Sequence, residues 1–66
     1  MIVGKKLKEL RKEEGWTQET LAEKLQISRG ALANYEIEAR EVPNQLIPVI
    51  AKLFEVTTDY LFGLED

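Results

Sequence analysis

The hydrophobic positions of the stretch 17–36, TQETLAEKLQISRGALANYE, repeat at helical spacing with one interruption. The spacing slips at Gln26-Ile27-Ser28 and then resumes, which predicts two helices that meet at a tight turn. A small residue, Ala22, lies where the two helices would approach each other most closely. The apolar positions expected to form the scaffold of this pair are Leu21, Leu25, Ile27, Leu32 and Tyr35.

The other apolar positions also follow helical spacing, and no segment shows the alternation that is typical of a strand. The sequence therefore predicts an all-α, compact five-helix domain that spans residues 1–66. Hydroxyl side chains that can cap free backbone N–H groups stand at three of the expected helix starts, at Thr17, Ser28 and Thr57. The expected helices cover residues 3–14, 18–25, 29–37, 45–54 and 58–62.

Each expected helix has one apolar face. In the first, Val3, Leu7 and Leu10 lie at i, i+4 and i+7, and Gly15 is placed to end the helix in a left-handed conformation. Pro48 is tolerable in the fourth helix because it lies in the first turn, where it removes one hydrogen bond at most. The fourth helix is expected to bury Leu46, Val49, Ile50 and Leu53. Gly63 is placed to close the fifth helix.

The composition excludes several classes of site. The chain has no cysteine and no histidine, so it lacks the usual metal ligands and the usual general base. Its carboxylates have no nucleophile or metal set beside them, and we expect no enzyme activity, no metal and no cofactor. No apolar run approaches the ~20 residues of a membrane span, and the N-terminus lacks the apolar region of a signal peptide. We therefore expect a cytoplasmic protein that is not attached to a membrane.

The net charge of −3 is unevenly distributed along the chain. Residues 1–12 carry five basic side chains and one acidic side chain, a local charge of +4. Residues 53–66 carry four acidic side chains and no basic one, a local charge of −4. An acidic total weakens non-specific affinity for nucleic acid, although it permits a face of positive potential. Taken alone, the composition favours a small acidic domain over a nucleic-acid-binding one.

Four segments together resemble the Xre family of helix-turn-helix proteins, the type found in Cro and the phage lambda repressor. They are GWTQETLAEKL in the second helix, ISRGALANYE in the turn and third helix, AREVPN in the next loop, and AKLFEVTTDYLFG in the last two helices. The resemblance covers nearly the whole chain and implies a lambda-repressor-like fold. It also implies that the third helix is a recognition helix for the DNA major groove, and that the protein binds a double-stranded operator, usually as a dimer.

The resemblance places the first turn of the third helix nearest to the base edges. Arg29 is the strongest candidate for reading a base, because its planar guanidinium can pair with guanine O6 and N7. Asn34 can pair with adenine, or reach only a phosphate. A solvated Arg29 and a Ser28 that only caps its helix are the alternatives. The expected base contacts are Ser28, Arg29, Gly30, Ala33 and Asn34.

A second set of residues is expected to contact DNA phosphates. Family members use a glutamine at the position of Gln18 for this purpose, and the free N–H groups at a helix start favour an anion there. An ordinary exposed glutamine is the alternative. The expected phosphate contacts are Gln18, Tyr35, Arg40 and Asn44.

Arg11 and Glu36 match two positions that form an internal ion pair in repressors of this type. Arg11 follows Leu7 by one helical turn, at the edge of the apolar face, where a solvated arginine is less natural. We expect this pair to be structural, tying the first helix to the end of the third.

The chain departs from the family pattern at two places. Gln26 occupies the turn position that is usually glycine, and a left-handed backbone there costs a non-glycine residue ~1–2 kcal/mol. The loop after the third helix commonly carries several basic residues, whereas here it contains Glu38 and Glu41. Both carboxylates would lie close to phosphates, which weakens the expected anchoring through this loop.

The last helix has more apolar surface than the fourth helix alone can cover. We therefore expect a homodimer through Tyr60, Leu61, Phe62 and Leu64. Two-fold symmetry would set two recognition helices ~34 Å apart and imply a near-palindromic operator. The chain is alternatively the DNA-binding part of a longer repressor.

Two functions follow from these observations. The leading prediction is a sequence-specific DNA-binding transcriptional regulator, a repressor that carries Gln18, Arg29 and Asn34 at the expected positions. The alternative is a protein-interaction or antitoxin-like module on the same fold, with secondary DNA binding, which the net negative charge and the acidic loop favour.

Overall fold

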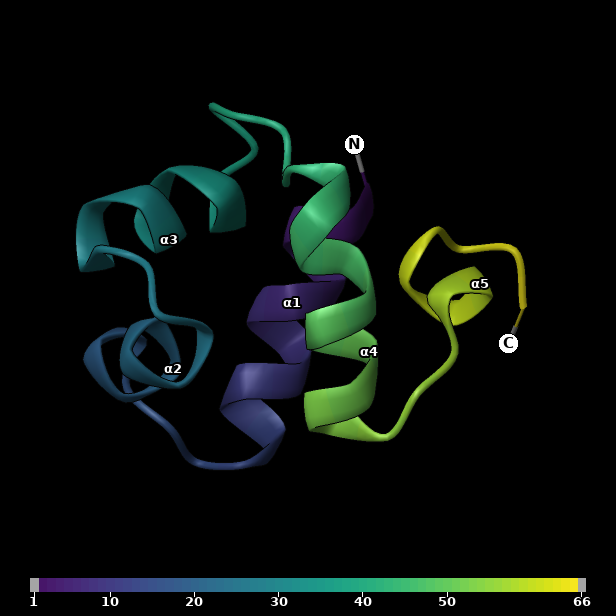
Figure 1. Cartoon of the computed structure of the whole chain (residues 1–66), viewed down its shortest axis with the longest axis horizontal. Coiled ribbons are helices and arrows are strands. Elements are labelled where there is room, and N and C mark those ends of the chain that lie inside the picture. Colours follow the sequence, from purple (N-terminus) through teal and green to yellow (C-terminus); the bar gives the residue numbers. More distant parts are fainter. Residues whose placement is uncertain (1, 66) are drawn as a thin grey trace.

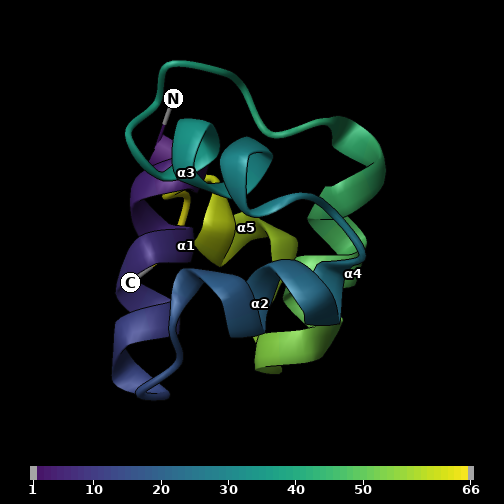
Figure 2. The same ribbon diagram turned by 90° about the vertical axis from the view of Figure 1, so that its left-hand side faces the viewer.

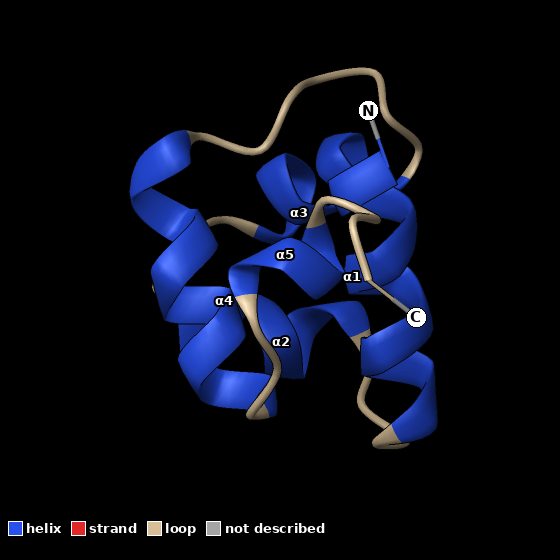
Figure 3. Ribbon diagram, turned by 90° about the vertical axis from the view of Figure 1, so that its right-hand side faces the viewer, coloured by secondary structure: helices blue, strands red, loops and turns tan. Residues whose placement is uncertain are grey.

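The computed structural model describes residues 2–65, and their regular structure is entirely helical (Figures 1 and 3). The α-helices are α1 (Ile2–Glu13), α2 (Gln18–Leu25), α3 (Arg29–Glu36), α4 (Ile47–Phe54) and α5 (Thr58–Leu61). One turn of 3-10 helix, η1 (Asn44–Leu46), leads into α4. The predicted all-α five-helix fold is therefore confirmed.

Helices α1 and α4 form the middle of the molecule, with α2 and α3 at one end and α5 at the other (Figure 1). Viewed from the first end, α3 and α2 lie in front (Figure 2), and viewed from the other end, α5 does (Figure 3). Every one of these helices contributes an apolar face to a single core. Its largest fully buried side chains are Val3, Leu7, Leu21, Leu32, Ile50 and Leu61.

The three predicted hydroxyl caps are confirmed. Thr17 Oγ1 accepts a hydrogen bond from the backbone N–H of Thr20 at 3.1 Å. Ser28 Oγ accepts from Ala31 at 3.0 Å, and Thr57 Oγ1 accepts from Tyr60 at 3.0 Å. Each cap satisfies a backbone donor that the first turn of a helix leaves free, which fixes where α2, α3 and α5 begin.

The prediction for the fourth helix was wrong in part. Val49, expected in the core, is 45% exposed, and Leu46 and Leu53 are only partly buried. Nearly every position from 46 to 54 is apolar, so two overlapping stripes have helical spacing, and the structure buries the stripe that begins at Ile47 instead of the one that begins at Leu46. Ile47, Ile50 and Ala51 consequently face the core. Pro48 lies in the first turn of α4, as expected.

Aromatic and cationic side chains link the loops to the helices. The rings of Trp16 and Phe54 lie 5.5 Å apart, which connects the α1–α2 loop to the end of α4. Lys24 Nζ lies 4.8 Å from the centre of the Trp16 ring, and Lys6 Nζ lies 4.4 Å from that of Tyr60. Within residues 2–65, no helix has both the length and the apolar character needed to cross a membrane.

Candidate nucleic-acid interface

The turn between α2 and α3 is closed by backbone hydrogen bonds. Gln26 adopts the left-handed conformation, with φ 58° and ψ 42°, as expected from its place in the turn. Its N–H donates to the carbonyl of Glu23 at 3.1 Å, and the N–H of Ile27 donates to Ala22 at 3.0 Å. These bonds end α2 as helices commonly end, although glycine usually fills this position. The turn therefore fixes the angle at which α3 leaves α2.

Helix α3 has a buried face and an open face. Leu32 is fully buried and Tyr35 is 7% exposed, so both pack into the core. Arg29, Gly30 and Asn34 are exposed on the other side. Helix α3 lies at one end of the molecule with α2 beside it (Figure 2), and the exposed residues of its open face extend from its first turn to Asn34.

The five residues expected to contact bases do not share one environment. Arg29, Gly30 and Asn34 lie on the open face of α3, and Ser28 is exposed just before it. The Oγ of Ser28 accepts its cap bond from the N–H of Ala31, and its O–H can still donate. Ala33 is half-buried, so less of its methyl group is available to a base. Arg29 is thus the one cation on α3, and its side chain is the longest on the open face.

An ion pair joins α1 to the end of α3. Arg11 Nε donates to Glu36 Oε2 at 2.8 Å, and Arg11 Nη2 donates to Glu36 Oε1 at 3.0 Å. The Arg11 side chain is 11% exposed and that of Glu36 is 0% exposed. The bidentate geometry orients both groups, and the burial makes the loss of either partner costly.

The same arginine also holds the loop before α2. Arg11 Nη1 donates to the backbone carbonyl of Trp16 at 2.8 Å. Trp16 is followed by Thr17, the N-cap of α2. Arg11 therefore connects α1, the end of α3 and the entry to α2 through one guanidinium group.

Gln18, expected to contact a phosphate, donates from Nε2 to Glu36 Oε1 at 3.0 Å and is half-buried. Sequence reasoning missed this contact, because nothing in the local pattern links residues eighteen positions apart. Gln18 is the first residue of α2, where the backbone N–H groups of the first turn point outward. The glutamine thus stands at a helix start with one of its two amide protons already engaged.

The other expected phosphate contacts are scattered. Arg40 and Asn44 are exposed in and after the loop that follows α3. Tyr35 is 7% exposed, so most of its side chain lies in the core. Glu41 is exposed in the same loop, and Glu38 adopts the left-handed conformation with φ 61°.

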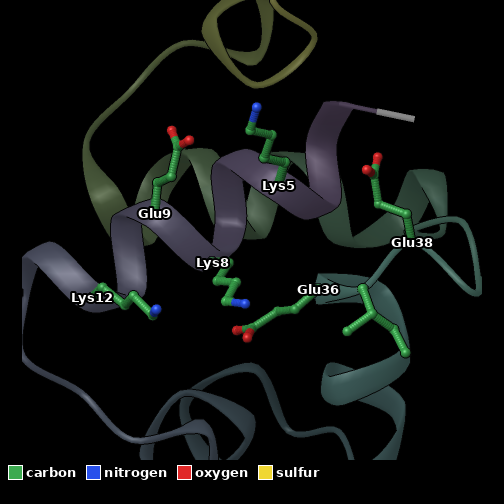
Figure 4. A pocket seen from close by; sticks show the side chains of 7 residues that line it. Lys5, Lys8, Glu9, Lys12, Glu36 and Glu38 are labelled. Carbon is green, nitrogen blue, oxygen red and sulfur yellow. The ribbon is translucent and has the colours of Figure 1, made fainter.

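A surface groove of about 330 Å³ lies between α1 and the end of α3 (Figure 4). Lysine side chains line it from α1, and Lys8 and Glu36 point toward one another across it in Figure 4. The positions of these lysines, i, i+3 and i+7, put them on one helix face, a pattern visible in the sequence that was not used to predict this groove. The groove is lined by Lys5, Lys8, Glu9, Lys12, Glu36, Ile37 and Glu38.

One residue expected at the dimer interface lies elsewhere. Leu61 is 0% exposed and belongs to the core, so its side chain is removed from any interface. A four-residue helix that packs between α1 and α4 must bury one side, and Leu61 is on that side. Tyr60 is half-buried beneath Lys6, whereas Phe62 is 37% exposed and Leu64 is 74% exposed.

Acidic side chains are frequent on the surface but are not gathered into a ligand set. Across residues 2–65, no group of three or more histidine, cysteine, aspartate or glutamate side chains is arranged to hold a metal ion.

Comparison with known proteins agrees with this geometry. Residues 4–66 match a protein family described as "Helix-turn-helix domain". The HTH-type transcriptional regulator ImmR of Bacillus subtilis (strain 168) is 41% identical over 66 residues, which cover 100% of this chain and 52% of ImmR. The uncharacterized HTH-type transcriptional regulator YobD of the same organism is 38% identical over 61 residues, covering 92% of this chain and 54% of YobD.

A third relative from the same organism, the HTH-type transcriptional regulator AnsR, is 35% identical over 60 residues, which cover 91% of this chain and 52% of AnsR. The chain thus spans about half the length of these curated relatives.

Proposed function

This chain belongs to the Xre-type helix-turn-helix family, and from that premise we propose that it is a sequence-specific DNA-binding transcriptional regulator. In this proposal α3 enters the major groove and α2 lies across the backbone. We propose further that the regulator is a repressor acting in the cytoplasm, where its DNA would lie.

The observation that carries the proposal is the open face of α3. Arg29 and Asn34 are exposed there, while Leu32 and Tyr35 on the opposite face hold the helix to the core. A rigid helix whose outward side chains are an arginine and an amide has the chemistry to read guanine and adenine edges. Ser28, Gly30 and Ala33 are short, so they allow close approach and supply at most minor contacts.

Phosphate contacts would orient this helix in the groove. Gln18 stands at the start of α2, and Arg40 and Asn44 flank the loop beyond α3. Glu41 is exposed in that loop and would repel a nearby phosphate, so a single domain would bind weakly. We therefore propose that affinity depends on pairing two domains.

The proposed pairing is a two-fold homodimer through the end of the chain that follows α5. Phe62 and Leu64 are exposed there, and Tyr60 is partly exposed, which supports an apolar contact between two copies. Two copies related in this way would present two recognition helices about 34 Å apart. Such a dimer would bind a near-palindromic operator, because each half reads the same sequence.

A protein-interaction module on the same fold, of antitoxin-like type, is the second candidate. The observations that favour it are the net charge of −3 and the exposed Glu41 in the loop beyond α3. In that case DNA binding would be secondary, and the open face of α3 would contact a protein.

Two experiments distinguish the DNA-binding regulator from the protein-interaction module: selection of bound sites from random DNA, and then anisotropy titrations with the selected site at two salt concentrations. We expect saturable binding whose affinity falls as salt rises, because phosphate contacts release counterions. Arg29→Ala should reduce the preference for the selected site about 5- to 150-fold, the equivalent of ~1–3 kcal/mol for one base contact. The matched control is Lys52→Ala on the exposed side of α4, which removes one positive charge and should leave the preference unchanged. Absence of any salt-dependent, saturable binding would favour the protein-interaction module.

A further inference from the structure

The carboxylate of Glu36 serves two elements at once. Oε1 accepts hydrogen bonds from Arg11 Nη2 and from Gln18 Nε2, each at 3.0 Å, and Oε2 accepts from Arg11 Nε at 2.8 Å. The side chain has no exposed surface, and these three hydrogen bonds from protein donors compensate the loss of its hydration. The last residue of α3 is therefore bonded directly to the first residue of α2.

This contact fixes the orientation of the Gln18 amide. An ionised carboxylate can only accept hydrogen bonds, so the NH₂ group of Gln18, not its oxygen, must face Glu36. A glutamine at a helix start otherwise samples many rotamers, and binding a phosphate would require it to lose that freedom. With Nε2 already held by Glu36, the second amide proton points in a defined direction before any ligand arrives.

The charge of Glu36 is compensated where it stands. Arg11 pairs with both carboxylate oxygens, and Lys8 points toward Glu36 from the other side of the groove (Figure 4). A phosphate that approached Gln18 would therefore meet a neutralised pair and not an isolated negative charge. Arg11 also holds the carbonyl of Trp16, which fixes the chain just before α2.

We propose that Glu36 is a positioning residue for DNA binding, which holds the Gln18 amide ready for a backbone phosphate. Through this bond the phosphate-contacting start of α2 is fixed relative to the reading helix α3. The inference rests on the proposed function, and it assigns to Glu36 a role beyond its ion pair with Arg11. A purely structural Glu36 would affect binding only as far as it affects folding.

The wild-type protein gives the first test, because it needs no substitution. The side-chain amide of Gln18, observed by ¹⁵N-resolved NMR in the free protein, should be well separated from exposed glutamine amides and should be rigid. The exposed Gln45 provides the internal comparison. A Gln18 amide as mobile as that of Gln45 would overturn the proposal.

A double-mutant cycle on DNA affinity gives the second test. Gln18→Ala and Glu36→Leu, each confirmed as folded at the temperature used, should each weaken binding to the selected site about threefold or more. Leucine is used at position 36 because a glutamine would keep an oxygen that can accept from Gln18 Nε2. The double variant should bind no more weakly than the weaker single variant, because both remove the same phosphate contact. The control is the exposed Gln45→Ala, which takes no part in the proposed contact and should leave the effect of Glu36→Leu unchanged.

The proposal would be overturned if the effects of Gln18→Ala and Glu36→Leu multiplied in the double variant, or if Gln18→Ala bound like the wild type. Both results leave the proposed function standing if Arg29→Ala still relaxes site preference. Failure of the wild type to bind any DNA would instead remove the function itself and this inference with it.

Discussion

Gly4 of α1 packs directly against the backbone carbonyl of Tyr35 in α3. A Cβ atom built at position 4 would lie 3.0 Å from the Tyr35 carbonyl carbon and closer still to its oxygen. The contact is between two backbones, so no flexible side chain can move aside to relieve it. Helices α1 and α3 therefore approach each other at Gly4 more closely than any residue with a Cβ atom would permit.

Gly4→Ala should destabilise the protein although alanine is the better helix former. The added methyl group forces α1 and α3 apart, and overpacking of this kind costs about 1–3 kcal/mol or more. For a domain this small that is a large share of its stability. Urea unfolding followed by circular dichroism measures the loss.

Gly30→Ala is the matched control for this change. Gly30 also lies in an α-helix, but a Cβ there would meet nothing within 4 Å. The control should be as stable as the wild type or more stable by up to about 1 kcal/mol. Equal stability of the two variants would show that the α1–α3 contact is looser than described.

Arg11→Ala should cost about 3 kcal/mol or more, because it leaves the carboxylate of Glu36 buried without its bidentate partner. It also releases the carbonyl of Trp16. Thermal unfolding is the measurement, with Lys12→Ala, an exposed neighbour on α1, as the control. An unchanged melting temperature for Arg11→Ala would contradict the structural role of the pair.

Local patterns were enough to predict most of the fold. The spacing of apolar residues located every α-helix, and Thr17, Ser28 and Thr57 marked three starts, because burial period and capping depend on residues within one or two turns. The buried and open faces of α3 follow from the same spacing, so the exposure of Arg29 and Asn34 could be anticipated.

Local patterns could not predict the features that depend on residues distant in the sequence. The bond between Gln18 and Glu36 joins two helices, and no propensity within either helix requires it. Because α4 is apolar at nearly every position, its own spacing could not show which face packs inward, and Val49 proved to be exposed. Leu61 was wrongly expected at the dimer interface because α1 as well as α4 packs against α5, and together they bury this side chain.

Gln26→Gly should stabilise the protein. Gln26 holds φ 58°, a left-handed conformation that costs a residue with a Cβ atom about 1–2 kcal/mol, whereas glycine adopts it freely. Part of the gain is lost to the greater freedom of glycine in the unfolded chain, so the expected net effect is about 0.5–1 kcal/mol. Urea denaturation measures this gain as a higher midpoint concentration with an unchanged m-value.

The reciprocal substitution tests the same reasoning. Gly15 has φ 75° and open space around its missing side chain, so Gly15→Ala should destabilise through the backbone alone. If Gln26→Gly were destabilising while Gly15→Ala was neutral, left-handed strain would not be the controlling term at either turn.

The exposed apolar residues beyond α5 lead to the last prediction, which concerns self-association. Leu64 is 74% exposed and Phe62 is 37% exposed, and Ile2, 41% exposed, lies beside Gly63 between them. Phe62→Ser with Leu64→Ser should raise the dimer dissociation constant about tenfold or more, since burying one such side chain stabilises by about 1.5–3 kcal/mol. Sedimentation equilibrium across micromolar concentrations measures the change.

Two further variants test whether Phe62 and Leu64 are responsible for self-association. Ile37→Ser removes a side chain that is 68% exposed just beyond the end of α3, in the groove lined by Lys5 and Lys8, and should leave association unchanged. Leu61→Ser should unfold the domain, because Leu61 is fully buried. A wild type that stays monomeric at high micromolar concentration would count against the dimer. Affinity for a palindromic operator would then have to arise from another contact between the two domains.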